Sequence, residues 1–230
     1  MPASQQSKAD AVPIVRDAPG WLRAVFWMCI VISGAVVLRR VVALAHPSTG
    51  APPDLAALDA FFAAHAALTL AHILPALAFV GLAPGIVYRQ SPVTGWLARL
   101  FFTLGGVVAI TAYAMSVDAF GGWTERSAVL LFNTLFFYSL SRAFLYLRRG
   151  EALAQRRWTL RAIGILLGIA TARPVMGIFF ATSRLTHLEP RQFFGWAFWI
   201  GFSINTLVVE WWLRTREAPV HLATTLNPEA

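Results

Sequence analysis

The residues of this sequence that could do chemistry are the few polar side chains inside its long apolar stretches: His65, His72, Asn133, Arg142, Arg173, Asn205 and Glu210. The most unusual is Arg173, which lies in the segment GIATARPVMGIFF, directly before Pro174. A guanidinium at membrane depth is costly, so such residues face the protein interior and have a specific role. Its five N–H donors suit Arg173 to bind carbonyl, carboxylate or neutral imidazole groups.

Three of these polar residues are expected at one depth. From the rise of about 1.5 Å per helical residue, His72, Arg173 and Asn205 fall in one layer, toward the outer ends of their predicted spans. We therefore expect them to share a polar cavity.

Two prolines lie beside this layer. Pro75 and Pro174 each remove a helical hydrogen bond and free the carbonyl four residues earlier, at Ala71 and Ala170. A freed carbonyl in lipid needs a donor. Arg173 is thus interpreted in two ways: it joins kinked helices by bonding such carbonyls and Asn205, or it binds an anionic or carbonyl-bearing ligand.

The histidines raise the question of haem. His65 and His72 are seven residues apart, hence on one helix face about 10 Å from each other. A helical bundle usually holds b-type haem between imidazoles of two facing helices, and here only Met176 is available as a partner for His65. Cys29 is the only cysteine, which excludes a thiolate metal site. Structural histidines are the main interpretation, so no cofactor and no metal are predicted, and a haem- or metal-binding redox protein using His65 or His72 is the alternative.

Glu210 is expected near the cytoplasmic end of the last span. Arg214 follows it by four residues and is expected to pair with it along the helix. Arg142 lies near the same interface and is a further candidate partner of Glu210.

The elements that must position these residues are membrane-spanning helices. The chain of 230 residues is 57% hydrophobic and only 13% charged, a composition typical of an integral membrane protein. Since a crossing helix needs about 20 apolar residues, six spans are predicted, at 21–43, 60–85, 97–118, 127–147, 160–182 and 193–213. A polar N-terminal tail at 1–20 and a C-terminal tail at 214–230 flank a transmembrane domain at 21–213.

The basic residues predict the orientation of these spans. With a cytoplasmic N-terminus, twelve Lys and Arg fall on the cytoplasmic side and five on the other. This bias predicts that both termini are cytoplasmic. The net charge of +8 is therefore attributed to topology, and no nucleic-acid partner is expected. GILLG (164–168) has the spacing of small residues that lets helices approach closely, either within the chain or between two copies.

The order of segments from about residue 61 to 214 resembles a family of bacterial predicted membrane proteins, domain of unknown function 2306. The matching segments are AHILPALAFVGLAPGIVYR (71–89), WLARLF (96–101), RRWTLRA (156–162), ATARPVMGIFF (170–180) and INTLVVEWW (204–212). The resemblance implies that His72, Arg173, Asn205 and Glu210 occupy family positions. Thr94 and Gln155 stand where the family has histidines, which makes a cofactor at those positions doubtful in this chain.

These observations predict an all-α bundle of about six transmembrane helices in a bacterial inner membrane. There is no phosphate-binding glycine loop, no paired carboxylates inside a span and no nucleophile beside a base, so a non-enzymatic protein is favoured. We expect it to bind a small ligand, a lipid or a partner subunit at His72, Arg173 and Asn205, with Glu210 as a further contact. A partner membrane protein or a second copy is a possible assembly, and a small-molecule transporter is a second alternative.

Overall fold

The computed structural model describes residues 18–46, 53–89 and 93–215, and all regular secondary structure within these ranges is helical. The helices are α2 (Gly20–Ala45), α3 (Pro53–Ala64), α4 (Ala66–Val87), α5 (Gly95–Met115), α6 (Gly122–Arg149), α7 (Ala152–Leu166), α8 (Gly168–Thr186) and α9 (Pro190–Thr215). The predicted tails lie almost entirely outside the described residues.

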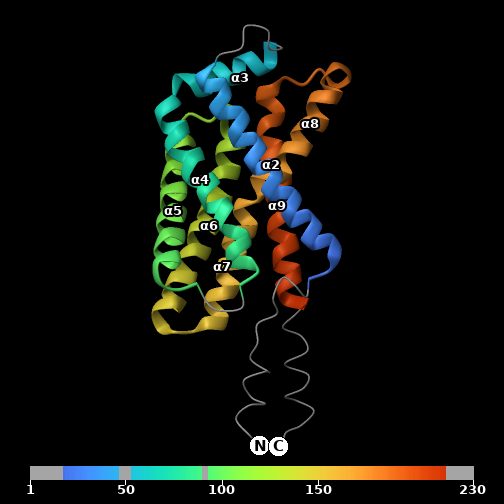
Figure 1. Cartoon of the computed structure of the whole chain (residues 1–230). Helices are drawn as coiled ribbons and strands as arrows, with labels where there is room; N and C mark the ends of the chain where they lie inside the picture. The colour runs from blue at the N-terminus through green and yellow to red at the C-terminus, as the bar shows by residue number, and fades with distance from the viewer. Residues whose placement is uncertain (1–17, 47–52, 90–92, 216–230) are drawn as a thin grey trace, which may run out of the picture.

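Six helical segments are long and apolar enough to cross a membrane, as predicted. They are α2, α4, α5, α6, α9 and the run Ala152–Ser183, which combines α7 with most of α8. In Figure 1, α2 begins and α9 ends at one end of the bundle, here called the terminal end, and α3 lies at the other, the α3 end. The all-α, multi-pass fold is therefore confirmed, whereas the side of the membrane that each end faces stays a prediction.

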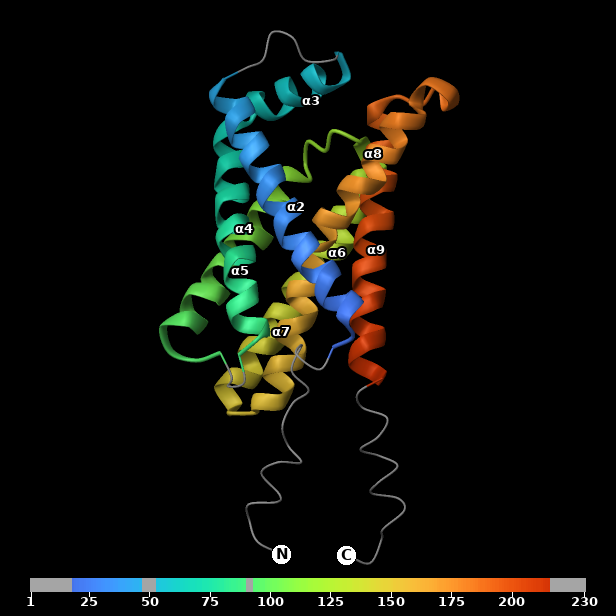
Figure 2. The same ribbon diagram turned by 45° about the vertical axis from the view of Figure 1, so that its right-hand side comes forward.

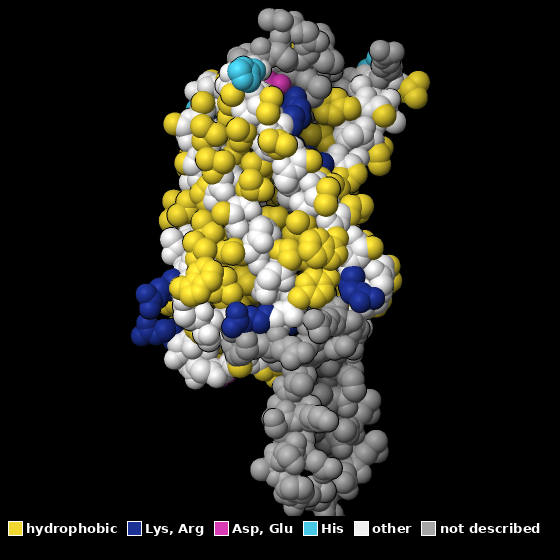
Figure 3. Space-filling model, in the orientation of Figure 1, with side chains coloured by type: hydrophobic (Ala, Val, Ile, Leu, Met, Phe, Trp, Pro, Cys, Tyr) yellow, Lys and Arg dark blue, Asp and Glu magenta, His cyan; other side chains and the backbone are white. Residues whose placement is uncertain are grey.

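The helices form two groups that share α6. On one side α4, α5 and α6 pack in chain order, and on the other α6 and α7 pack with α9, against which α8 also packs. Helix α2 crosses both groups obliquely and contacts α4 and α8 (Figures 1 and 2). The middle of the face in Figure 3 is mainly hydrophobic, and Lys and Arg side chains gather toward the terminal end.

Helix α3 corrects the predicted second span, 60–85. The backbone breaks at His65, with φ −120° and ψ 38°, and the spanning helix α4 begins at Ala66. Helix α3 lies across the α3 end of the bundle (Figure 2). Apolar residues continue through the break without Gly or Pro, so the sequence carries no local signal of two helices.

The break in the fifth span also differs from the prediction. Helix α7 ends at Leu166 and α8 begins at Gly168, whereas α8 continues through Pro174. A side chain at Gly168 would collide with Phe202 of α9, and one at Gly164 would collide with Val209. The small residues of GILLG therefore pack against α9 of the same chain, which is the first of their two interpretations.

Helices α8 and α9 also approach closely higher in the bundle. A Cβ added at Gly201 would meet the backbone of Ala172, so only glycine permits this contact. This close packing fixes the rotation of α8 and with it the direction of its polar side chains.

Candidate functional site: a cavity between α2, α4, α6 and α8

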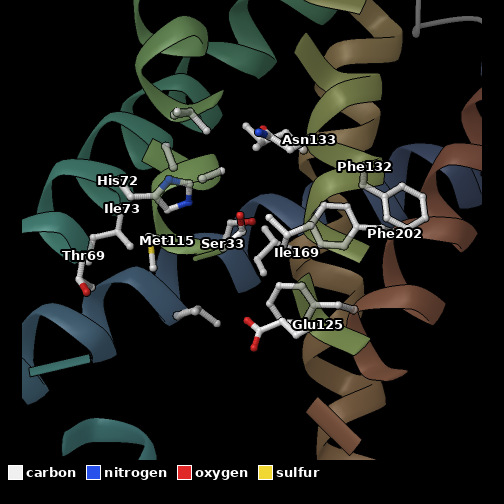
Figure 4. A pocket seen from close by; sticks show the side chains of 18 of the residues that line it. Ser33, Thr69, His72, Ile73, Met115, Glu125, Phe132, Asn133, Ile169 and Phe202 are labelled. Atoms are coloured by element: carbon white, nitrogen blue, oxygen red, sulfur yellow. The ribbon is translucent and has the colours of Figure 1, made fainter. Parts of the chain in front are cut away.

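A cavity of about 210 Å³ lies inside the bundle toward the α3 end. Residues of α2, α4, α5, α6, α8 and α9 form most of its wall (Figure 4). The surface in Figure 3 is hollowed between α2 and α8 near this end. Most of the lining is apolar, and its polar members are Ser33, Arg40, Thr69, His72, Ser116, Asp118, Glu125, Asn133 and Arg173.

Arg173 lines this cavity with few contacts of its own. Its Nε is buried and has no hydrogen-bond partner, and its Nη1 lies 4.0 Å from the sulfur of Met176. Among the described residues no carboxylate forms a direct ion pair with it. A cationic side chain with buried donors and a thioether as neighbour is weakly satisfied by the protein.

Glu125 is a buried carboxylate that lines the same cavity as Arg173, and the sequence analysis did not identify it. It lies in the first turn of α6, is buried, and its Oε2 accepts a hydrogen bond of 2.6 Å from the backbone N–H of Gly121. Its charge and that of Arg173 attract each other through space. The carboxylate points into the cavity in Figure 4.

The sequence does contain a signal for Glu125. The predicted span began at residue 127, which left Glu125 in a connector. Two glycines precede it, Gly122 has φ +63°, and a carboxylate in the first turn suits the positive end of the helix dipole. That pattern marks the start of α6 at Gly122 and so places Glu125 inside the bundle.

Arg40 is a second charged residue of the cavity lining, and in the sequence analysis it served only to predict the orientation of the spans. Asp59 of α3 accepts hydrogen bonds from Arg40, at 2.6 Å, and from Arg39, at 3.0 and 3.2 Å. The guanidinium of Arg40 also lies 4.1 Å from the ring centre of Phe62. Arg40 and Arg39 therefore share one carboxylate of α3, and these contacts hold α3 over the cavity.

His72 and Asn133 join the cavity wall to α5. The hydroxyl of Thr111 donates to the carbonyl of Val107 at 2.7 Å and therefore accepts, at 2.9 Å, from Nδ1–H of His72. This arrangement leaves the lone pair of the neutral imidazole on Nε2. Asn133 donates its amide to the carbonyl of Ala109 at 2.9 Å. The ring of His72 points toward the cavity in Figure 4.

Asn205 is not part of this cavity, which corrects the predicted three-residue layer. Its Oδ1 accepts from Thr171 at 2.6 Å, and its amide donates to the carbonyl of Gly164 at 3.3 Å. Thr171 and Arg173 are two residues apart, hence about 200° apart around α8. Asn205 meets the Thr171 side and does not bond Arg173. Depth alone predicted proximity, but depth carries no information about which way a side chain faces.

Glu210 lies at the terminal end, away from the cavity. It accepts hydrogen bonds of 2.8 Å from Arg161 and from Arg214, so the predicted pair along the helix is confirmed. The candidate pair of Glu210 with Arg142 does not form: Arg142 instead donates to the hydroxyl of Tyr146 and lies 5.2 Å from the ring of Trp158. Arg142 therefore contacts aromatic rings of α6 and α7 in place of Glu210.

His65 and His72 do not lie on one continuous helix, as the haem alternative expected. His65 is exposed at the break between α3 and α4, where its Nε2 lies 3.9 Å from Asp118. It does not continue the helix that carries His72. In the described ranges, no three His, Cys, Asp or Glu side chains come together as a metal-binding group.

The two positions where the resemblance expects histidines are neighbours at the terminal end. Gln155 is buried and donates to the carbonyl of Val93 at 2.8 Å, next to Thr94, which precedes α5. Arg156 donates to the carbonyls of Val87 and Arg89. These side chains of α7 therefore hold the connection between α4 and α5.

The fold and the cavity define a class: a helical membrane protein of six spans with an internal, mostly apolar cavity that carries opposite charges on α6 and α8. Comparisons with protein-family models, with curated proteins and with solved structures find no match. The resemblance to the family of domain of unknown function 2306 therefore stays a prediction.

Proposed function

We propose that this is a non-enzymatic, multi-pass protein of the bacterial inner membrane that binds a small ligand or lipid in the cavity at Arg173. The observation that carries the proposal is the arginine itself. It lines a cavity of about 210 Å³, and its buried Nε has no hydrogen-bond partner.

A buried charge that lacks a partner destabilises the fold, and a carboxylate or phosphate that accepts two of its N–H groups removes this cost. His72 adds an acceptor to the cavity lining, while Asn205 joins α9 to α8 and Glu210 joins α9 to α7. The apolar lining accommodates a ligand with an apolar body.

The location follows from the distribution of charge. Lys and Arg are concentrated toward the terminal end, as the cytoplasmic side of an inner-membrane protein requires. In this orientation the cavity lies in the outer half of the protein, because it is closer to the α3 end.

Native mass spectrometry tests the proposal. The full-length protein and its Arg173→Met variant are purified in parallel in a mild detergent. We expect the wild-type protein to retain an additional small mass that the variant has lost. Arg142→Met is the matched control, because Arg142 lies outside the cavity lining, and it is expected to retain the same mass.

A further inference from the structure

We propose that the head of the ligand is a zwitterion, with an ammonium group and an acidic oxyanion close together on an apolar body. This inference rests on ligand binding in the cavity and adds the chemical class of the ligand. Its basis is the sign of each charge that lines the cavity and the partner that each charge already has.

The cationic side of the site is Arg173. The other arginine of the lining, Arg40, is bonded to Asp59 at 2.6 Å and covers the ring of Phe62. Arg40 therefore has a counter-ion, which it shares with Arg39, whereas Arg173 has a sulfur contact at 4.0 Å. One positive charge in the cavity remains to be matched by an anionic group.

The anionic side of the site is Glu125. The other carboxylate of the lining, Asp118, is 67% exposed and lies beside His65, so water and that imidazole solvate it. Glu125 is only 8% exposed, and one of its oxygens is bonded to the N–H of Gly121. A single backbone N–H leaves a buried carboxylate short of donors, which an ammonium group supplies.

Glu125 and Arg173 do not neutralise each other directly. Their charges attract each other through space without a direct ion pair, and the charges of Arg40 and Arg39 repel Arg173. A purely anionic ligand would pair with Arg173 and repel Glu125, and a purely cationic ligand would do the reverse. A zwitterion gives both Arg173 and Glu125 a partner of opposite charge.

The surroundings fit the remaining parts of such a molecule. Nε2 of His72 is a further hydrogen-bond acceptor in the cavity lining, because Nδ1–H is bonded to Thr111. Phe132, Phe202 and Ile169 line the cavity in Figure 4 and provide an apolar surface for the body. Both a free apolar amino acid and an aminophospholipid headgroup carry this chemistry.

Three matched probes test the charge pattern with the full-length protein in detergent. Phenylalanine, 2-phenylethylamine and 3-phenylpropanoate share one ring and chain, and they carry both charges, only the cation and only the anion. By calorimetry we expect phenylalanine to bind at least tenfold more tightly than either of the others. The lipid arm compares lysophosphatidylethanolamine with the anionic lysophosphatidylglycerol, and the same preference for the zwitterion is expected there if a lipid is the source.

Two variants assign the preference to its residues. Glu125→Gln keeps an oxygen for the Gly121 N–H, and it should remove the preference over the anionic probe. Arg173→Gln should remove the preference over the cationic probe. The wild-type comparison stands alone if a variant does not fold.

Other results would overturn the inference. If an anionic probe binds best and needs Arg173, the zwitterion is wrong while ligand binding at Arg173 stands. If no zwitterionic probe binds in either arm, the inference falls as well, and retention of a native mass by the wild-type protein then decides the proposed function independently. Preference for the zwitterion in only one arm identifies the source of the ligand.

Discussion

At the scale of single residues, Arg173 is distinguished by what it does not bond. It was expected either to join helices through Asn205 and freed carbonyls or to serve a ligand. In the structure Asn205 bonds Thr171 and Gly164 instead, and the Nε of Arg173 is buried without a hydrogen-bond partner. Thr171 and Asn205, and not Arg173, therefore make the polar contacts that join α8 and α9.

The first consequence concerns stability. Arg173→Met should leave the thermal stability of the ligand-free protein unchanged or raised, because the variant removes a buried charge that has few protein partners. Asn133→Leu is the comparison: it removes the 2.9 Å bond to Ala109 and should lower the free energy of unfolding by about 0.6–1.7 kcal/mol. Thermal unfolding in detergent measures both. A larger loss in Arg173→Met than in Asn133→Leu would show that Arg173 is structural.

At the scale of elements, charged side chains join α3 to α2. One carboxylate, Asp59, holds both Arg39 and Arg40 of α2. Phe61 and Phe62 of α3 line the cavity. The position of α3 over the cavity is therefore coupled to a charge cluster of three residues.

Asp59→Asn should loosen α3 without unfolding the bundle. A hydrogen bond to a charged group contributes about 1.5–3 kcal/mol, and about 1.4 kcal/mol is a factor of ten, so amide hydrogen exchange in Pro53–Ala64 should accelerate at least tenfold. Asp118→Asn is the matched control, because its carboxylate is 67% exposed and should leave exchange in α3 unchanged. Equal exchange in all three proteins would show that packing alone holds α3.

The sequence predicts the helices better than it predicts the rotation of each helix about its axis. Apolar length identifies all six spans, and spacing along one helix identifies the Glu210–Arg214 pair. The cavity is predicted only in part: His72 and Arg173 line it, Asn205 does not, and Glu125, Arg40 and Asp59 were missed as site or clamp residues. Depth follows from residue number, whereas rotation about the helix axis depends on contacts such as Gly201 with Ala172.

At the scale of the whole molecule, the bundle has an even number of spans, which places the start of α2 and the end of α9 at one end. The excess of Lys and Arg at this end predicts that it faces the cytoplasm. In that orientation the cavity would lie in the outer half of the bundle, because it is closer to the α3 end.

A reporter enzyme that is active only in the periplasm measures this orientation. Fused after Ala230 it should be inactive, and fused after Val117, between α5 and α6, it should be active. The second fusion is the control for expression and folding of the reporter. The reverse pattern would invert the orientation and place the cavity toward the cytoplasm.

Ligand binding at Arg173 is tested most directly by the native mass of the purified protein. The wild-type protein and the Arg142→Met control are predicted to carry the same additional small mass, and Arg173→Met to carry none. Identical spectra for all three proteins, whether each retains the mass or each lacks it, would contradict ligand binding at Arg173.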